Sequence, residues 1–169
     1  MRFSYLPVFA LLFPFFVGCN QTDDLKGIFM GKTWKLTEIR YDNGSLCRDY
    51  WVTASGGFDQ EAFDSSYKQK DARECFTLIL SGVESDGKAS GQYVGRATNV
   101  ALSGNWSAGG ESRTFQTSNQ SVETDKDVLG RAFANAIKNA EFYSGDYNNL
   151  TIYFKESQVR KYLLMHVSK

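Results

Sequence analysis

Histidine and cysteine are scarce in this chain, which contains one of the former and three of the latter among 169 residues. Zinc sites combine these residue types at short spacings, whereas Cys47 and Cys75 stand 28 positions apart. The sequence has no Gly-x-Ser-x-Gly nucleophile motif, no Gly-rich phosphate loop and no complete calcium loop. We therefore expect no metal, no cofactor and no enzymatic activity. An envelope hydrolase is an alternative function, which would need either two carboxylates from adjacent strands or His166 to converge in a cleft.

Net charge and long apolar runs are also lacking. Nineteen basic residues balance nineteen acidic ones, and no basic stripe is interleaved with aromatic residues, so we expect no nucleic-acid partner. After position 17 no apolar run is long enough to cross a membrane. Proline occurs only at positions 7 and 14, whereas aromatic residues make up 15% of the chain and glycines separate short apolar runs. This composition favours a β-rich globular domain.

The first 18 residues have the pattern of a secretory leader. Arg2 provides a positive charge, residues 5–17 form an apolar run rich in Phe and Leu, and the small residue Gly18 ends the segment. The run is shorter than the about 20 residues that a transmembrane helix needs. Its prolines also fit a leader better than an uncleaved anchor or a packed helix. We expect residues 1–18 to be a signal peptide, whose removal leaves 151 of the 169 residues.

The polar stretch that follows Gly18-Cys19 completes a pattern that resembles the lipobox of bacterial, Bacteroidetes-type lipoproteins, with Phe16 where leucine is commonest. The resemblance implies that Cys19 carries acyl chains such as palmitate, which anchor the protein to the outer membrane. Asp23-Asp24 resembles an export signal for the cell surface, and a plain polar tether is the alternative, so periplasmic and surface-exposed locations both stay open. We expect a lipidated tether over 19–31 and one domain over 32–169.

Cys47 and Cys75 remain once Cys19 is assigned to lipid. Two thiols in an oxidising compartment commonly pair, and only one pairing is available to them. The alternative is a pair of reduced, buried thiols. Both states are compatible with the sequence.

Short apolar-polar alternations predict strands over 33–41, 75–81, 90–98, 100–106, 112–118, 149–155 and 158–167. The apolar positions of the first strand change parity between Leu36 and Ile39, which indicates a bulge or a bend. A stripe of apolar residues from Val128 to Ala140 predicts one helix, with Thr124 as its N-cap. The expected fold class is mainly β (α+β), with an antiparallel curved or barrel-like sheet and one packed amphipathic helix.

Residues 46–74 form a long excursion between the first two strands. Gly56-Gly57 interrupts it, and the spacing of Phe63 and Tyr67 predicts one or two helical turns. Its mixed charges fit a solvated face. The length of the excursion also allows a functional lid or a protein-binding loop.

Three short motifs give the order of elements a family resemblance. They are the opening Trp34-Lys35-Leu36, the central run from Gly95 to Trp106, and the closing Gly145-Asp146 with Asn149-Leu150-Thr151-Ile152. Over residues 30–167 this pattern resembles the META/HslJ-like group and the lipocalin-like lipoproteins of unknown function from Bacteroidetes. The central cysteine of the META/HslJ-like pattern is absent. The resemblance implies a fold and no particular activity.

The sequence therefore predicts an envelope lipoprotein with a non-enzymatic binding or structural role. Its membrane contact is the N-terminal lipid, and its ligand is either an apolar small molecule or a protein. A ligand carrier would have a closed apolar cavity. A protein-binding or inhibitory module would expose an apolar patch or a projecting loop within 46–74.

Overall fold

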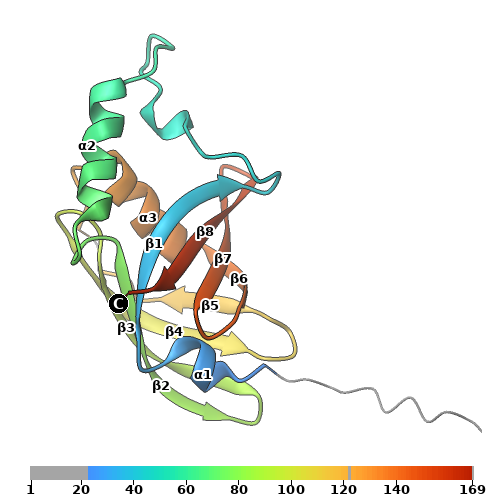
Figure 1. The fold of residues 1–169 in the computed structure, drawn as a ribbon. Helices are drawn as coiled ribbons and strands as arrows, with labels where there is room; N and C mark the ends of the chain where they lie inside the picture. Colours follow the sequence, from blue (N-terminus) through green and yellow to red (C-terminus); the bar gives the residue numbers. More distant parts are fainter. Residues whose placement is uncertain (1–22, 122, 169) are drawn as a thin grey trace, which may run out of the picture.

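The computed structural model describes residues 23–121 and 123–168. These residues form eight strands, three α-helices and one 3-10 turn (Figure 1). In chain order the elements are α1 (Leu25–Phe29), β1 (Thr33–Tyr41), η1 (Asp49–Trp51), α2 (Gln60–Asp71), β2 (Thr77–Ser85), β3 (Lys88–Arg96), β4 (Ala101–Gly109), β5 (Phe115–Ser118), α3 (Val128–Lys138), β6 (Ala140–Gly145), β7 (Asn149–Glu156) and β8 (Val159–Val167).

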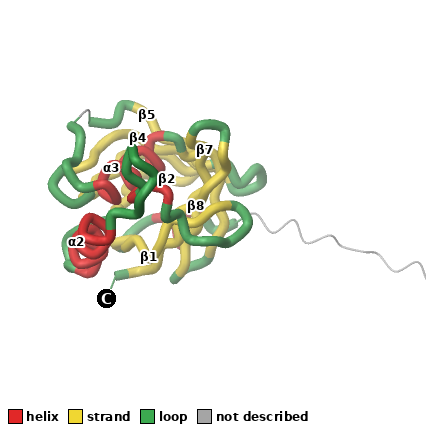
Figure 2. The backbone as a smooth tube through the Cα atoms, turned by 90° about the horizontal axis from the view of Figure 1, so that it is seen from above, coloured by secondary structure: helices red, strands yellow, loops and turns green. Residues whose placement is uncertain are grey.

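The strands make one antiparallel sheet in the order β5-β4-β3-β2-β1-β8-β7-β6. The sheet curves until its two edge strands approach each other, and a single bridge joins Thr114 to Phe142. Among the described residues, no ladder of paired strands joins β5 to β6 to close the ring. Seen from above in Figure 2, the strands curve round α3. The predicted mainly β, antiparallel curved sheet is therefore confirmed.

Alternating burial in the strands follows the sequence pattern. Leu150, Ile152 and Phe154 of β7 are buried, and the residues between them are more exposed. The predicted bulge in β1 is present as a register shift against β8 between Leu36 and Glu38. This irregularity lets one strand present apolar side chains of both parities to the concave side.

A close approach of two backbones marks the pairing of β2 with β3. Gly82 and Gly91 are partners in the ladder. A Cβ atom on Gly91 would lie 2.0 Å from the carbonyl oxygen of Ser81, and one on Gly82 would lie 2.1 Å from that of Ser90. Only glycine fits such an approach, so these two residues permit a local strand geometry that other residues would disrupt.

Gly91→Ala is therefore expected to lower the free energy of unfolding by roughly 2 kcal/mol or more, because the added methyl group meets backbone rather than a flexible side chain. Gly57→Ala is the matched control, since its Cβ would lie 3.6 Å from Thr53 Oγ1, an ordinary contact. Urea denaturation of both variants measures the difference. Equal stability of the two would contradict the close approach.

The concave side of the sheet is filled by aromatic and aliphatic side chains. Phe29 of α1 contacts three rings, those of Trp106, Phe115 and Tyr143, at centroid distances of 4.8 to 5.3 Å. On α3, Phe133 is fully buried and packs edge-on against Phe76. The two helices thus complete the core from different positions along the chain.

The structure corrects three expectations about local elements. Residues 25–29 form α1, and Leu25, Ile28 and Phe29 are buried, so the domain includes much of the predicted tether and begins before residue 32. The N-cap of α3 is Asp127 rather than Thr124. The predicted elements also omitted β6, which starts two residues after α3 ends.

Candidate functional site

The excursion over residues 46–74 is an ordered projection at one end of the sheet (Figure 1). Its outermost part is a tight turn, Val52–Phe58, which we call the tip hairpin. Val52 and Phe58 form an antiparallel bridge, and Thr53 N donates to the carbonyl of Gly57 at 2.8 Å. Because bridged residues point to the same side, the two apolar side chains lie together, and they are 50% and 40% exposed.

A small aromatic cluster supports the tip hairpin from below. Trp51 is buried, with its ring 4.9 Å from that of Phe63, and Phe63 stacks on Tyr67 at 4.4 Å. Phe58 joins this cluster through Phe63 at 5.5 Å. The Arg48 guanidinium lies over the Phe63 ring at 5.5 Å. The predicted helical turns of 61–74 are in fact the twelve-residue helix α2.

Lys161 holds the base of the excursion. This β8 side chain is only 3% exposed and points to the concave side. Its Nζ donates to Glu156 Oε2 at 2.8 Å and to Asp49 Oδ2 at 3.1 Å. Tyr50 lies 4.3 Å below the ammonium group and donates its hydroxyl proton to the same Glu156 oxygen at 2.8 Å. We call Asp49, Tyr50, Glu156 and Lys161 the Lys161 cluster.

Opposite charges stabilise the ionised forms within this cluster. Burial works against the charge on Lys161, but the hydrogen bonds from its ammonium to Glu156 and Asp49 outweigh burial and raise its pKa above the ordinary value. Burial likewise opposes ionisation of Glu156, and Lys161 with Tyr50 outweighs it, so the pKa of this carboxyl is lowered. Burial, together with Glu156, raises the pKa of Tyr50. The cluster therefore holds a lysine cation, a carboxylate and a neutral tyrosine at neutral pH.

A second chain of polar contacts joins α2 to the start of α3. The Trp51 indole Nε1 donates to Ser66 Oγ at 3.2 Å, and Ser66 in turn donates to Asp127 Oδ2 at 2.8 Å. Asp127 also caps α3 by accepting from Gly130 N at 2.8 Å. Helix α2 is thus tied to the body of the domain through buried Ser66 as well as through packing.

The C-terminal end of α2 is tied to the sheet by Lys35. Its buried ammonium donates to the carbonyl oxygens of Ala72 and Cys75. Burial lowers the pKa of this lysine. The excursion is therefore tied to the body of the domain at its start, its middle and its end, and these contacts support the tip hairpin from both sides.

The structure places the sequence-predicted residues apart from one another. Cys19 lies outside the described residues. Cys47 and Cys75 are separate buried thiols, which corresponds to the reduced alternative rather than to the disulfide. Burial raises the pKa of Cys47 to about 12, so this thiol is protonated and unreactive at neutral pH.

His166 is exposed on the outward face of β8, which it shares with Tyr162 and Leu164. Its Nδ1 shares a hydrogen bond with Thr37 Oγ1 at 2.8 Å. Burial, and then the nearby lysines, lower its pKa. Among the hydrogen bonds of the described residues, this imidazole is joined to Thr37 and to no carboxylate.

The described residues contain no group of three or more His, Cys, Asp or Glu side chains that could hold a metal ion. In this part of the chain no helix is long and apolar enough to span a bilayer.

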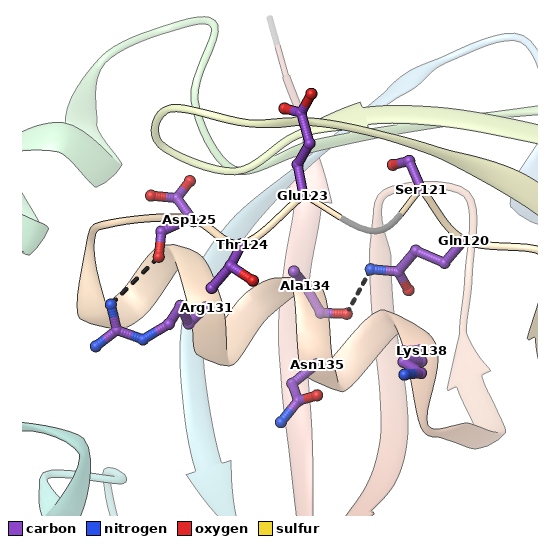
Figure 3. Close-up of a pocket in the computed structure, with 9 residues that line it drawn as sticks. All are labelled: Gln120, Ser121, Glu123, Thr124, Asp125, Arg131, Ala134, Asn135 and Lys138. Atoms are coloured by element: carbon purple, nitrogen blue, oxygen red, sulfur yellow. Dashed lines mark hydrogen bonds between the residues drawn. The ribbon is translucent and has the colours of Figure 1, made fainter.

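A polar groove of about 330 Å³ runs between α3 and the loop before it (Figure 3). Gln120 closes one side by donating from Nε2 to the carbonyl of Ala134 at 3.1 Å, and Arg131 donates to the carbonyl of Asp125 at 3.2 Å. The groove is open to solvent and has charged groups of both signs. It differs from the closed apolar cavity that a ligand carrier would have, and the filled core also counts against that function.

Sequence reasoning missed the Lys161 cluster and the role of Asp127. Residues 49 and 161 are 112 positions apart, and no local sequence pattern predicts a contact between residues so distant in the chain. One signal was available, because Lys161 occupies an inward position of the alternating strand β8, where a lysine needs a buried partner. A glutamate at the inward end of β7 is its nearest candidate in the hairpin.

This curved sheet with an inserted helix and an ordered excursion defines a class of small β-rich domains. The model of the family described as "Domain of unknown function (DUF4847)" matches residues 20–167, so the chain belongs to that family. A solved DUF4847 family protein from Bacteroides vulgatus ATCC 8482 is similar in fold, with a TM-score of 0.57 and 21% identity over 83% of this chain and 95% of that chain. No curated protein matches the chain. The resemblance to the META/HslJ-like group stays a prediction.

Proposed function

We propose that this chain is an envelope lipoprotein, anchored to the outer membrane by acyl chains on Cys19, that binds a protein partner through the tip hairpin. The role is non-enzymatic. The observation that carries the proposal is the pair Val52 and Phe58, which lie side by side and exposed at the end of a rigidly held projection. Contiguous exposed apolar side chains mark interaction sites, whereas scattered single ones are common on any surface.

The shape of the site favours a protein over a small molecule. Small-ligand sites are concave and enclose most of the ligand, whereas the tip hairpin is a projecting turn. Protein interfaces are enriched in aromatic residues and arginine at their centre, and Phe58 has Arg48 beside it at 6.0 Å. The contacts of Lys161, Ser66 and Lys35 already order the excursion before a partner binds. The loss of conformational entropy on binding is therefore smaller.

Photo-crosslinking in the native cell tests the proposal. A photoreactive residue replaces Phe58 in one strain and Val94 in a control strain, since Val94 is 54% exposed on the outer face of β3. We expect a discrete protein adduct from position 58 that position 94 does not give. Identical adduct patterns from both positions, or no adduct from position 58, would contradict it. Mass spectrometry of the mature N-terminus in the same cells tests whether Cys19 carries acyl chains.

A further inference from the structure

We propose that the α1 end of the domain lies against the surface of the lipid bilayer, so that the tip hairpin points away from it. This orientation rests on the lipidation of Cys19 in the proposed function. It assigns a membrane-facing surface to a domain whose described residues have no membrane-spanning helix.

The chain is fixed to the domain from its first described residue. Asp23 Oδ2 accepts a hydrogen bond from the Tyr143 hydroxyl at 2.9 Å and lies 3.4 Å from Arg113 Nε. Asp24 caps α1 by accepting from Gly27 N at 2.8 Å. Its other oxygen accepts from the Tyr147 hydroxyl at 2.7 Å. Helix α1 packs behind these contacts. Together they fix the point on the surface where the chain leaves the domain toward Cys19, which we call the exit of the chain.

The chain between Cys19 and Asp23 is short. Four Cα-to-Cα steps separate the two residues, and they span at most about 14 Å when fully extended. A nine-residue strand such as β2 is about 30 Å long. A lipid on Cys19 therefore brings the bilayer within reach of the α1 end of the sheet, and the far end stays beyond it.

The tip hairpin belongs to the far end. Strand β2 starts where the excursion ends and finishes beside α1, where Glu84 accepts a hydrogen bond from Lys26 N at 2.7 Å. The base of the excursion instead contacts the β7–β8 turn through Glu156. Figure 1 shows α1 and the excursion at opposite ends of the curved sheet.

The side chains around the chain exit fit an interfacial position. Val83, Phe142 and Tyr147 are exposed, at 71%, 42% and 57%. Val83 and Phe142 lie on the outward face of β2 and β6, next in sequence to Glu84, which bonds α1, and to Tyr143, which bonds Asp23, and Tyr147 bonds Asp24 directly. Tyrosine and apolar side chains suit the headgroup region of a bilayer. Among the described residues, three of the eight large exposed apolar side chains thus belong to the strands and the turn that bond the start of the described chain.

Energy transfer on vesicles tests the orientation. The mature chain is coupled through the Cys19 thiol to a maleimide-bearing lipid in phosphatidylcholine vesicles that contain an acceptor-labelled lipid. A donor fluorophore is placed by a genetically encoded residue at Glu111, two residues from Arg113, or at Ser55 in the tip hairpin. The two buried cysteines are shielded from coupling. A variant with about twenty Gly/Ser residues inserted after residue 22, reaching about 25 Å, is the control.

We expect about twofold higher transfer efficiency from position 111 than from position 55, because ~30 Å separates the two ends of the sheet. The insertion should reduce this difference. Equal efficiencies with the native spacing, or a higher efficiency from position 55, would overturn the orientation. Chemical coupling requires neither lipidation in the cell nor a protein partner, so this result and the crosslinking result can fail independently.

Discussion

Asp125→Ala is expected to lower the free energy of unfolding by about 4 kcal/mol, because it removes a buried carboxylate that satisfies several donors at once. Asp125 is 2% exposed. It accepts hydrogen bonds from the backbone N–H groups of Thr98, Asn99, Val100 and Asp127 and from the side chain of Asn99, at 2.7 to 3.3 Å. The alanine variant would leave four backbone donors without this acceptor.

Two further variants separate the charge from the shape of this side chain. Asp125→Asn keeps the size and one acceptor oxygen, so we expect a loss of about 2 kcal/mol. Glu123→Gln removes the same charge from an exposed position two residues earlier and should change stability by less than about 0.5 kcal/mol. Chemical denaturation measures all three, and an Asp125→Ala loss below about 1 kcal/mol would contradict the role of the carboxylate.

The effect of Asp125 also has a defined pH dependence. Burial opposes its ionisation, but the hydrogen bonds from Asn99, Asp127 and Thr98 outweigh burial and hold its pKa below the ordinary value of 3.8. A carboxyl group whose pKa is lower in the folded state than in the unfolded state stabilises the fold at pH values above its unfolded-state pKa. This stabilisation is lost as the pH falls through the folded-state pKa. The stability difference between the wild-type protein and Asp125→Asn should therefore shrink when the pH is lowered from 5 toward 3.

Lys161→Met is expected to lower the free energy of unfolding by about 3 kcal/mol, because it leaves Glu156 and Asp49 without their buried cation. We also expect this substitution to change the local dynamics of the excursion. Because Asp49 and Tyr50 begin the base of the excursion, loss of the ammonium should also loosen the tip hairpin. Hydrogen exchange of residues 49–58 measures this loosening, and unchanged protection there would contradict the anchoring role of Lys161.

A double variant and a surface control make the interpretation of Lys161 specific. Lys161→Met/Glu156→Gln removes both charges and should recover part of the loss, since the uncharged pair leaves no unpaired, half-buried carboxylate at position 156. Lys155→Met breaks an exposed contact to Glu141 at 3.5 Å and should cost less than about 1 kcal/mol. A double variant no more stable than Lys161→Met would indicate that lost packing, rather than lost charge pairing, causes the effect.

The directions of the two pKa shifts in the Lys161 cluster define the pH range over which it stabilises the fold. The lowered pKa of Glu156 means that its contribution is lost as the pH falls below its ordinary value of 4.5. The raised pKa of Lys161 means that its contribution is lost as the pH rises above 10.5 and through the folded-state pKa. The cluster therefore stabilises the base of the excursion over the whole neutral range.

Strong local patterns made much of the fold predictable from sequence. The bounds of β1 match the prediction at both ends, and β7 and β8 differ from it by one residue at one end. Strands β7 and β8 alternate between inward and outward side chains, and the burial of most of their side chains follows from parity. The parity switch between Leu36 and Ile39 indicated a bulge or a bend in β1, and the register shift against β8 shows that it is a bulge.

Elements with weak or overlapping local signals were missed. Helix α1 has only five residues, yet its N-cap Asp24 and the i, i+3, i+4 spacing of Leu25, Ile28 and Phe29 were legible signals. Strand β6 follows α3 so closely that Ala140 continued the helical stripe. The Lys161 cluster and the Asp125 contacts depend on residues far apart in the chain, so only the folded structure brings them together.

The sequence predicted where the projecting segment lies in the chain, but it did not predict the conformation of the tip hairpin. The length of residues 46–74 indicated a feature of interest, and Gly56-Gly57 indicated a turn. The sequence did not reveal that Val52 and Phe58 face the same way, since that follows from their bridge. It also did not reveal the rigid support, which comes from β7, β8 and the start of α3.

The central claim is that the exposed pair Val52 and Phe58 forms the centre of a protein-binding surface. The most direct measurement is the dissociation constant between the purified domain and the partner crosslinked at position 58, for the wild-type protein and for Val52→Ser/Phe58→Ser. Loss of a central apolar pair should weaken binding by at least about 30-fold, corresponding to about 2 kcal/mol. Val83→Ser/Val94→Ser, which changes two exposed valines of the sheet, should leave the affinity unchanged. Equal affinity of the wild-type protein and the tip variant would contradict the claim.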